Sequence, residues 1–449
     1  MDNRTQEFLT RPIIPLLIRM SAPNTIAFFI QSLVVLTEVW FISRLGTNSL
    51  AAVALAFPLL MITQTMSGGA LGGAITSAIA RSMGADDIEK AERLIWHSII
   101  ISLGGAITFL ILFLLFGKQL LFLLGGRGEI LQESYAYCSI LFFGGILLWL
   151  SGSLSAVLRG MGNMRFPATL MVITSSIQVI LSGGFILGWF GFPKLGVPGA
   201  AVAVLISSAL MVTVILLKLR SKSIPASLRK ERFQLRKILF DNIFEVAIPA
   251  SLSPLLVVGT ILVLTGLVGR FGTEALAGYG IGSRVEFLMI PLIFGIGSAM
   301  TSIVGANIGA LNIDRAEKVG ILGGSTAGFV SILIGLTLAA FPEAWIQFFT
   351  DDIKAFEVTK KYIQIVGPFY IFQGIGLSLY FASQGANAMK WPTIATIARF
   401  IIACAGGGVS VYWLELGIES IFISSSAAMA IFGLMIFISI KKGAWRKNL

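Results

Sequence analysis

Two glutamates, Glu38 and Glu286, lie inside long apolar segments of this chain, whereas nearly all of its 22 acidic residues fall between such segments or at their ends. A charged carboxylate in hydrocarbon costs at least roughly 2.5 to 3.5 kcal/mol on insertion scales, so both side chains should face a cavity or a partner. Desolvation disfavours the ionised form of a carboxyl group, which allows a buried glutamate to gain and lose a proton. We therefore predict that Glu38 and Glu286 are ion-coupling residues.

Polar residues near Glu38 recur at helical spacing. Asn24 and Gln31 precede it at intervals of seven residues, so the three share one helix face. A second polar stripe recurs every four residues and consists of Thr174, Gln178 and Ser182. Two such stripes predict the walls of an aqueous, substrate-binding pocket. The alternative is that the amides and hydroxyls only hold helices together, as they do in many membrane proteins.

The second glutamate has an arginine close to it in sequence. Arg284 lies two residues before Glu286, so the two side chains point to different sides of a regular helix and need other partners. They either contact substrate and the coupling ion or are neutralised by neighbouring helices. Arg399, deeper in its segment, is expected to snorkel to the membrane surface or to bond carbonyl groups. Pro23 and Pro249 predict kinks and are candidate hinges, although a passive bend is equally compatible.

The elements that must position these residues are transmembrane helices. Of the 449 residues, 56% are hydrophobic and only 12% charged, and the mean hydropathy is +0.89, which indicates an all-α integral membrane protein. One histidine and two cysteines offer no metal-ligand spacing, so we expect no metal and no cofactor. Apolar runs of about 20 residues or more predict twelve helices. They lie near residues 13–43, 48–80, 94–116, 131–158, 166–189, 196–217, 238–268, 275–307, 318–341, 354–384, 391–413 and 418–440.

The basic residues predict the orientation of the chain. If the N-terminus is cytoplasmic, 23 of the 33 Lys and Arg residues fall on cytoplasmic segments, as the positive-inside rule requires. Because twelve is even, both termini are then cytoplasmic. The net charge of +11 is thus a topology signal, and anionic membrane lipids are its natural partners. A nucleic-acid partner is not expected, since the only strongly basic stretch is a short segment between helices.

The chain contains an internal repeat. Pro23 matches Pro249, and the RLG motif at 44–46 matches the RFG motif at 270–272, both at an offset of 226 residues. The segments MGADDIEKAE and RGMGNMRFP match IGALNIDRAE and QGANAMKWP at an offset of 225 residues. We infer two homologous six-helix bundles, residues 1–220 and 238–449, joined by a basic cytoplasmic linker at 221–237. They would be related by a pseudo-two-fold along the membrane normal, with the substrate path between them.

These motifs together resemble the multidrug and toxic compound extrusion (MATE) family over essentially the whole chain. The resemblance rests on SRLGTNSLAAVALAFP, GADDIEKA, GMGNMRFP, GFPKLGVPGAAVA, GSRVEFLMIP and VGANIGALNIDRA. The SRVE element is more similar to the prokaryotic DNA-damage-inducible F-type branch than to the norfloxacin-pump branch. The resemblance implies a V-shaped twelve-helix fold and export of organic, often cationic, compounds against entering H+ or Na+. Glu38 stands where the family commonly has an aspartate. Gln178 and Ser182 stand where many members carry asparagine and aspartate, so a second N-terminal carboxylate is missing.

We therefore expect a monomeric drug antiporter of the bacterial inner membrane, coupled to H+ in preference to Na+, because Na+ needs several oxygen ligands. A flippase for lipid-linked substrates from the same superfamily is the main alternative, and it would require a strongly basic cavity. A membrane sensor would need an output domain, yet the longest loop has only about twenty residues. An intramembrane enzyme would need a nucleophile or metal motif, and neither GxSxG nor metal-ligand spacing occurs.

Overall fold

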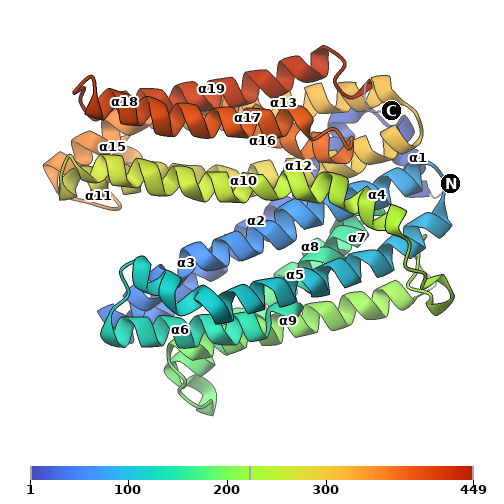
Figure 1. Ribbon diagram of the computed structural model, residues 1–449, viewed down its shortest axis with the longest axis horizontal. Coiled ribbons are helices and arrows are strands. Elements are labelled where there is room, and N and C mark those ends of the chain that lie inside the picture. The colour runs from blue at the N-terminus through green and yellow to red at the C-terminus, as the bar shows by residue number, and fades with distance from the viewer. Residues whose placement is uncertain (1–2, 222–223, 447–449) are drawn as a thin grey trace. The chain divides into compact units, whose positions relative to one another are not determined.

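The structure is a computed structural model that describes residues 3–221 and 224–446, so residues 222 and 223 of the predicted linker lie outside it. Helices make up most of the described chain, in which no strand occurs (Figure 1). Eleven of these helical segments are long and apolar enough to cross a membrane, and one bent helix pair brings the number to twelve. The predicted all-α integral membrane fold is confirmed.

The chain forms two compact units. The first comprises Met1–Glu7 and Ile26–Ala247, and the second comprises Phe8–Thr25 and Ile248–Leu449. Two long helices, α2 (Ile13–Ser43) and α10 (Lys237–Gly269), therefore contribute residues to both units. In α2 the change of unit falls two residues after Pro23, and in α10 it falls two residues before Pro249.

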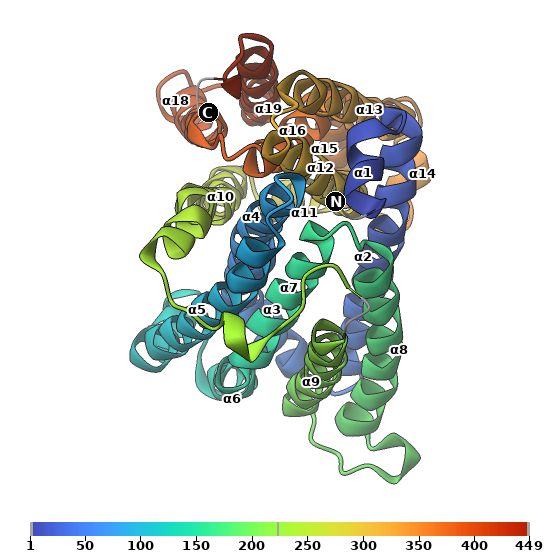
Figure 2. The same ribbon diagram turned by 90° about the vertical axis from the view of Figure 1, so that its right-hand side faces the viewer.

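The first unit consists mainly of long helices whose apolar faces pack into one hydrophobic core. Its further elements are α3 (Thr47–Gln64), η1 (Thr65–Leu71), α4 (Gly72–Gly84), α5 (Ile88–Leu123), α6 (Gly128–Phe143), α7 (Gly145–Gly160), α8 (Arg165–Leu187), η2 (Trp189–Gly191), α9 (Val197–Arg220) and η3 (Lys230–Arg232). Helix α8 packs beside α9, and α3 packs on α6 (Figure 2). Stacked rings of Phe113 and Phe142, 4.4 Å apart, join α5 to α6 in the core.

The second unit has a comparable set of helices. They are α11 (Thr273–Ser283), α12 (Val285–Gly309), α13 (Ile313–Ala340), α14 (Glu343–Ile346), α15 (Ile353–Val366), η4 (Gly367–Phe369), α16 (Tyr370–Gly385), α17 (Lys390–Ile401), η5 (Ile402–Gly406), α18 (Gly407–Tyr412) and α19 (Glu419–Lys441). The short helix α1 (Asn3–Thr10) begins in the first unit and ends in the second unit. The buried side chain of Phe8 belongs to the second unit. Helix α16 packs on α12, α13 and α19, and so forms the centre of this unit.

Several predicted spans are interrupted where glycine is frequent. The segment predicted as one helix at 131–158 divides into α6 and α7, which meet at Gly144 with a bend of 52°. Paired glycines are a common site of such kinks because they favour the helix least apart from proline. The segments η1 and η5 are π-helical, and the first contains Gly68 and Gly69. Such single turns of wider helix re-aim the residues that follow them.

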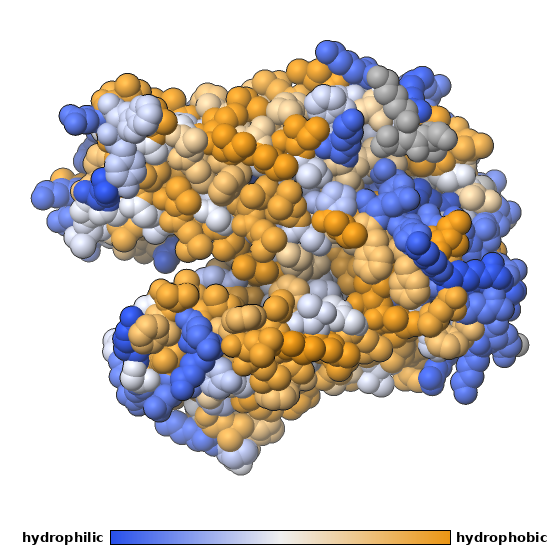
Figure 3. Space-filling model, viewed as in Figure 1, coloured by the Kyte–Doolittle hydropathy of each residue, from blue (hydrophilic) through white to orange (hydrophobic). Residues whose placement is uncertain are grey.

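Apolar side chains cover the middle of the helices, and charged side chains gather at their ends (Figure 3). Large hydrophobic residues on α5 remain exposed, including Ile111, Leu115 and Phe116. An exposed apolar surface of this extent needs lipid to cover it.

Helix α13 approaches η4 so closely that only glycine fits at the contact. A methyl group on Gly335 would lie 2.1 Å from the carbonyl oxygen of Gly367. Because a backbone atom cannot rotate away, we expect Gly335→Ala to lower the free energy of unfolding by about 1–3 kcal/mol. The matched control is Gly266→Ala on α10, where nothing lies within 4 Å of the added methyl group. Thermal unfolding of the purified proteins should show a lower midpoint for the first variant alone; equal midpoints would contradict the contact.

Candidate functional site

Glu38 is buried in the first unit, where α2 faces α8. Its carboxylate is bound by two of the residues predicted from the second polar stripe. The hydroxyl of Ser182 donates to Oε1 at 2.6 Å, and Nε2 of Gln178 donates to the same oxygen at 2.9 Å. The side chain of Glu38 is only 8% exposed. The structure thus brings Glu38 into contact with two residues that lie 140 and 144 positions later in the sequence.

The donors around Glu38 are electrically neutral. Within the part of the chain that the structure describes, no basic side chain forms an ion pair with it, and Oε2 accepts no hydrogen bond. Tyr137 on α6 is an electrostatic neighbour of the carboxyl group. Buried hydrophobic residues of the core, among them Phe41 and Ile186, surround this region. One carboxylate oxygen is therefore held in place while the other stays available for a proton or a ligand.

The contact between α2 and α8 continues one or two turns further along. The hydroxyl of Ser175 donates to Oε1 of Gln31 at 2.8 Å. Ser175 was not predicted from the sequence. It lies three residues before Gln178 and seven residues before Ser182. Intervals of three and four residues together keep side chains on one helix face. Repeated intervals of four residues, as in Thr174, Gln178 and Ser182, rotate the side-chain direction by about 40° at each step.

Thr174 does not take part in the contact with Glu38. Its hydroxyl donates to the carbonyl oxygens of Leu170 and Met171 in its own helix, at 3.0 and 3.2 Å. Its carbonyl oxygen accepts a hydrogen bond from Ser207 of α9 at 3.1 Å. Thr174 therefore contributes to the packing of α8 on α9 and makes no hydrogen bond to the carboxylate of Glu38.

Asn24 belongs to the second unit, unlike the other two residues of its predicted stripe. Its Nδ2 donates to the hydroxyl of Ser298 on α12 at 2.9 Å. Pro23 lies inside α2, and Pro249 lies inside α10, so the chain stays helical through both candidate hinges.

Glu286 lies near the start of α12 in the second unit. The hydroxyl of Tyr362 donates to its Oε1 at 3.1 Å. Tyr279, Tyr370 and Arg399 are further electrostatic neighbours. The electrostatic contact of Arg399 with Glu286 was not predicted from the sequence, which favoured snorkelling to the membrane surface or bonding to carbonyl groups. The guanidinium of Arg399 lies 5.3 Å from the ring centroid of Phe432 and interacts electrostatically with Glu286.

Arg284 is exposed and lies apart from this group. Its guanidinium carbon is 5.8 Å from the ring centroid of Phe349, and it forms no ion pair with Glu286 in the described structure. No group of three or more His, Cys, Asp or Glu side chains with the arrangement of a metal site occurs among the described residues. Oxygen atoms of Gln31, Gln178 and Ser182 are the neutral groups that could join Glu38 around a monovalent cation.

These features define the chain as a polytopic helical membrane protein with ionisable groups inside its bundles. The sequence profile of the MatE family matches residues 23–182 and 249–407, which is most of the chain. The chain belongs to the multidrug and toxic compound extrusion (MATE) family of transporters.

Individual relatives agree with this assignment. The probable multidrug resistance protein NorM of Thermotoga maritima is 26% identical over 96% of this chain and 93% of its own. An FAD transporter of Shewanella oneidensis is 26% identical over 86% of this chain and 84% of its own. A crystal structure of MATE in complex with MaL6 has a TM-score of 0.90 at 25% identity and matches 100% of both chains. A MOP superfamily transporter from Pyrococcus furiosus has a TM-score of 0.91 at 24% identity, which supports the fold alone.

Proposed function

We propose that this protein is a secondary antiporter that exports organic cations in exchange for entering protons, with Glu38 as the coupling group. The observation that carries the proposal is the carboxylate of Glu38, buried and bonded only through Oε1 to two neutral donors. No basic side chain among the described residues forms an ion pair that would balance its charge. An exported cation or an entering proton can each supply that balance, and they exclude one another.

The exchange follows from this competition. With Glu38 ionised, an organic cation is attracted to the available oxygen Oε2. Protonation from the outer side then removes the negative charge, so the cation loses its counter-charge and leaves. Exchange of one monovalent cation for one proton moves no net charge, so the pH gradient rather than the membrane potential would drive it. Each pH unit across the membrane is worth about 1.4 kcal/mol and could sustain a tenfold substrate gradient.

The polar groups around Glu38 favour a proton over Na+. A sodium ion needs several oxygen ligands, whereas Gln178 presents its Nε2 group to the carboxylate and Ser182 presents its hydroxyl hydrogen. Both side chains would have to turn before they could offer oxygen to a cation. A proton on Oε2 leaves both hydrogen bonds to Oε1 intact.

Glu286 has a different environment and, in our proposal, a different role. Arg399 is an electrostatic neighbour of Glu286, so the carboxylate is compensated inside the protein. We propose that this pair positions α12 against α15 and α17 and that it stays charged through the transport cycle. Asn24, Gln31 and Arg284 remain proposed substrate contacts, and Pro23 and Pro249 remain proposed hinges. Both termini are proposed to face the cytoplasm of a bacterial cell.

Flux measurements in proteoliposomes test the function directly. Purified protein is reconstituted, and a fluorescent organic cation is followed under an imposed pH gradient or, separately, an imposed Na+ gradient. We expect the pH gradient to drive movement of the cation and the Na+ gradient to drive little. Because one relative is an FAD transporter, FAD serves as an anionic comparison substrate. Movement of FAD but not of the cation, or coupling to Na+ alone, would overturn the proposal.

A further inference from the structure

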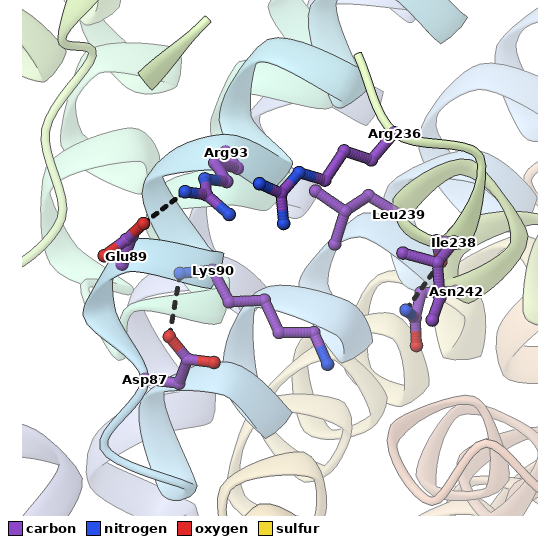
Figure 4. A pocket seen from close by; sticks show the side chains of 8 residues that line it. All are labelled: Asp87, Glu89, Lys90, Arg93, Arg236, Ile238, Leu239 and Asn242. Carbon is purple, nitrogen blue, oxygen red and sulfur yellow. Dashed lines mark hydrogen bonds and ion pairs between the residues drawn. The ribbon is translucent and has the colours of Figure 1, made fainter. Parts of the chain in front are cut away.

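We propose that a cationic pocket at the start of α5 and α10 binds the phosphate group of an anionic membrane lipid. The pocket belongs to the first unit and encloses a cavity of about 400 Å³. Figure 4 shows the side chains that line it. They are Asp87, Glu89, Lys90, Arg93, Arg236, Ile238, Leu239 and Asn242.

Three basic side chains line this cavity. The guanidinium groups of Arg93 and Arg236 end close together, and the ammonium group of Lys90 lies apart from them (Figure 4). Lys90 and Arg236 have no acidic partner among the described residues. The Nε atom of Arg93 is buried without a hydrogen-bond partner. Adjacent cations that repel one another and leave a buried donor unpaired indicate a place for an anion.

The two acids of the pocket are already engaged elsewhere. Asp87 caps α5, where its Oδ1 accepts the backbone N–H of Lys90 at 2.9 Å. Glu89 forms ion pairs with Arg93 and with Arg232, the latter at 2.9 Å. Both acids keep their negative charge, so the five charged side chains that line the pocket sum to +1. The cavity keeps an excess of positive charge, which favours a ligand with a negative charge and several acceptor oxygens, such as phosphate.

The backbone segment that carries Arg236 is held against α5 before any ligand arrives. The backbone N–H of Arg236 donates to Nε2 of His97 at 3.1 Å. The segment before Arg236 is also bound to the buried Glu92 of α5. The carboxylate of Glu92 accepts hydrogen bonds from the backbone N–H and the hydroxyl of Ser227, both at 3.2 Å, and it forms an ion pair with Arg229 at 3.2 Å. These contacts fasten the segment before α10 to α5. A site whose charges are positioned in advance loses less conformational entropy when it binds.

The position of the pocket favours a lipid as the source of the phosphate. Both α5 and α10 are apolar enough to span a membrane, and the pocket lies where both helices begin. Ile238 lines the pocket and is 66% exposed, so an apolar side chain lies beside the cations. A headgroup phosphate with its acyl chains along α10 would satisfy both the cations and this apolar surface.

Lipid titration of the full-length protein in detergent tests the site. Native mass spectrometry follows the binding of phosphatidylglycerol, with zwitterionic phosphatidylcholine and inorganic phosphate as comparison ligands. In the double variant Lys90→Gln/Arg236→Gln, we expect the apparent Kd for phosphatidylglycerol to rise roughly 10- to 30-fold, from the loss of two lysine or arginine contacts near a membrane surface. The single variant Lys90→Gln should show a smaller rise in the same direction.

The control removes the same charge elsewhere. Lys230 and Lys442 are exposed and do not line the pocket, so Lys230→Gln/Lys442→Gln should change the apparent Kd by less than about twofold. An equal rise of the apparent Kd for phosphatidylglycerol in the two double variants would show that diffuse electrostatic attraction holds the lipid, and would overturn the proposal. Equal binding of phosphatidylglycerol and phosphatidylcholine by the unaltered protein would also overturn it. Binding of inorganic phosphate but not of phosphatidylglycerol would overturn the assignment to a lipid.

Discussion

Glu38→Gln is expected to reduce proton-driven efflux at least tenfold, while the protein still inserts and folds. Glutamine has nearly the same shape, and its Oε1 can still accept from Ser182 and Gln178, so the contact of α2 with α8 should survive. It cannot exchange a proton or carry a negative charge, so the competition between cation and proton is lost. Efflux of the fluorescent cation from proteoliposomes under a pH gradient, normalised to reconstituted protein, measures the effect.

Ser175→Ala is the matched control for this result. It removes the hydrogen bond to Gln31 on the same pair of helices but leaves every bond to Glu38 intact. A side-chain hydrogen bond contributes about 0.5–1.5 kcal/mol to stability, so the variant should fold and transport within about twofold of the unaltered protein. If Glu38→Gln transports normally, coupling does not lie on α2. A loss of efflux in both variants would indicate that the packing of α2 on α8, rather than the proton, is what matters.

Glu286→Gln is expected to act mainly on stability. Removing the carboxylate leaves Arg399 without an electrostatic neighbour that compensates its charge, and an uncompensated charge inside a helix bundle is destabilising. The midpoint of thermal unfolding of the purified protein should fall by several degrees. Efflux per folded molecule should stay within a fewfold of normal, in contrast to the result for Glu38→Gln.

The double variant Glu286→Gln/Arg399→Gln separates the two roles that Glu286 could have. If the carboxylate is retained to balance Arg399, removing both charges should restore most of the lost stability. Arg399→Gln alone should destabilise the protein by a similar amount, because the unpaired carboxylate is then the uncompensated charge. If Glu286→Gln folds like the unaltered protein but loses efflux, and the double variant does not recover it, Glu286 is a coupling residue and our assignment is wrong.

Local composition and pattern were enough for the class of protein and for its elements. Twenty or so apolar residues in a row are sufficient to predict a membrane span, since the cost of burying charge acts on each segment separately. The exceptions occur where local geometry decides, as at Gly144, where two glycines allowed a 52° bend within a segment predicted as one helix. The resemblance of ordered motifs to the MATE family also depended on sequence alone, and the family is confirmed.

Partners across helices were harder to predict. Helical spacing placed Glu38 on one stripe and both Gln178 and Ser182 on another, but spacing within a helix cannot say which faces meet. It included Thr174, which bonds to its own helix, and it omitted Ser175, which bonds to Gln31. The relative rotation of α2 and α8 decides these contacts, and it results from the packing of the whole first unit.

The sequence by itself placed two carboxyl groups inside apolar segments long enough to span a membrane, because the length and hydropathy of each segment depend only on the residues in it. Only the tertiary structure decided what each carboxyl group meets. Glu38 meets neutral donors from a helix 140 residues away, and Glu286 lies near Arg399, which had been expected to reach the membrane surface or to bond carbonyl groups. The physical reason is that hydrogen bonds and charge pairs depend on distances of a few ångströms between helices, and these distances are fixed by side-chain packing throughout each unit.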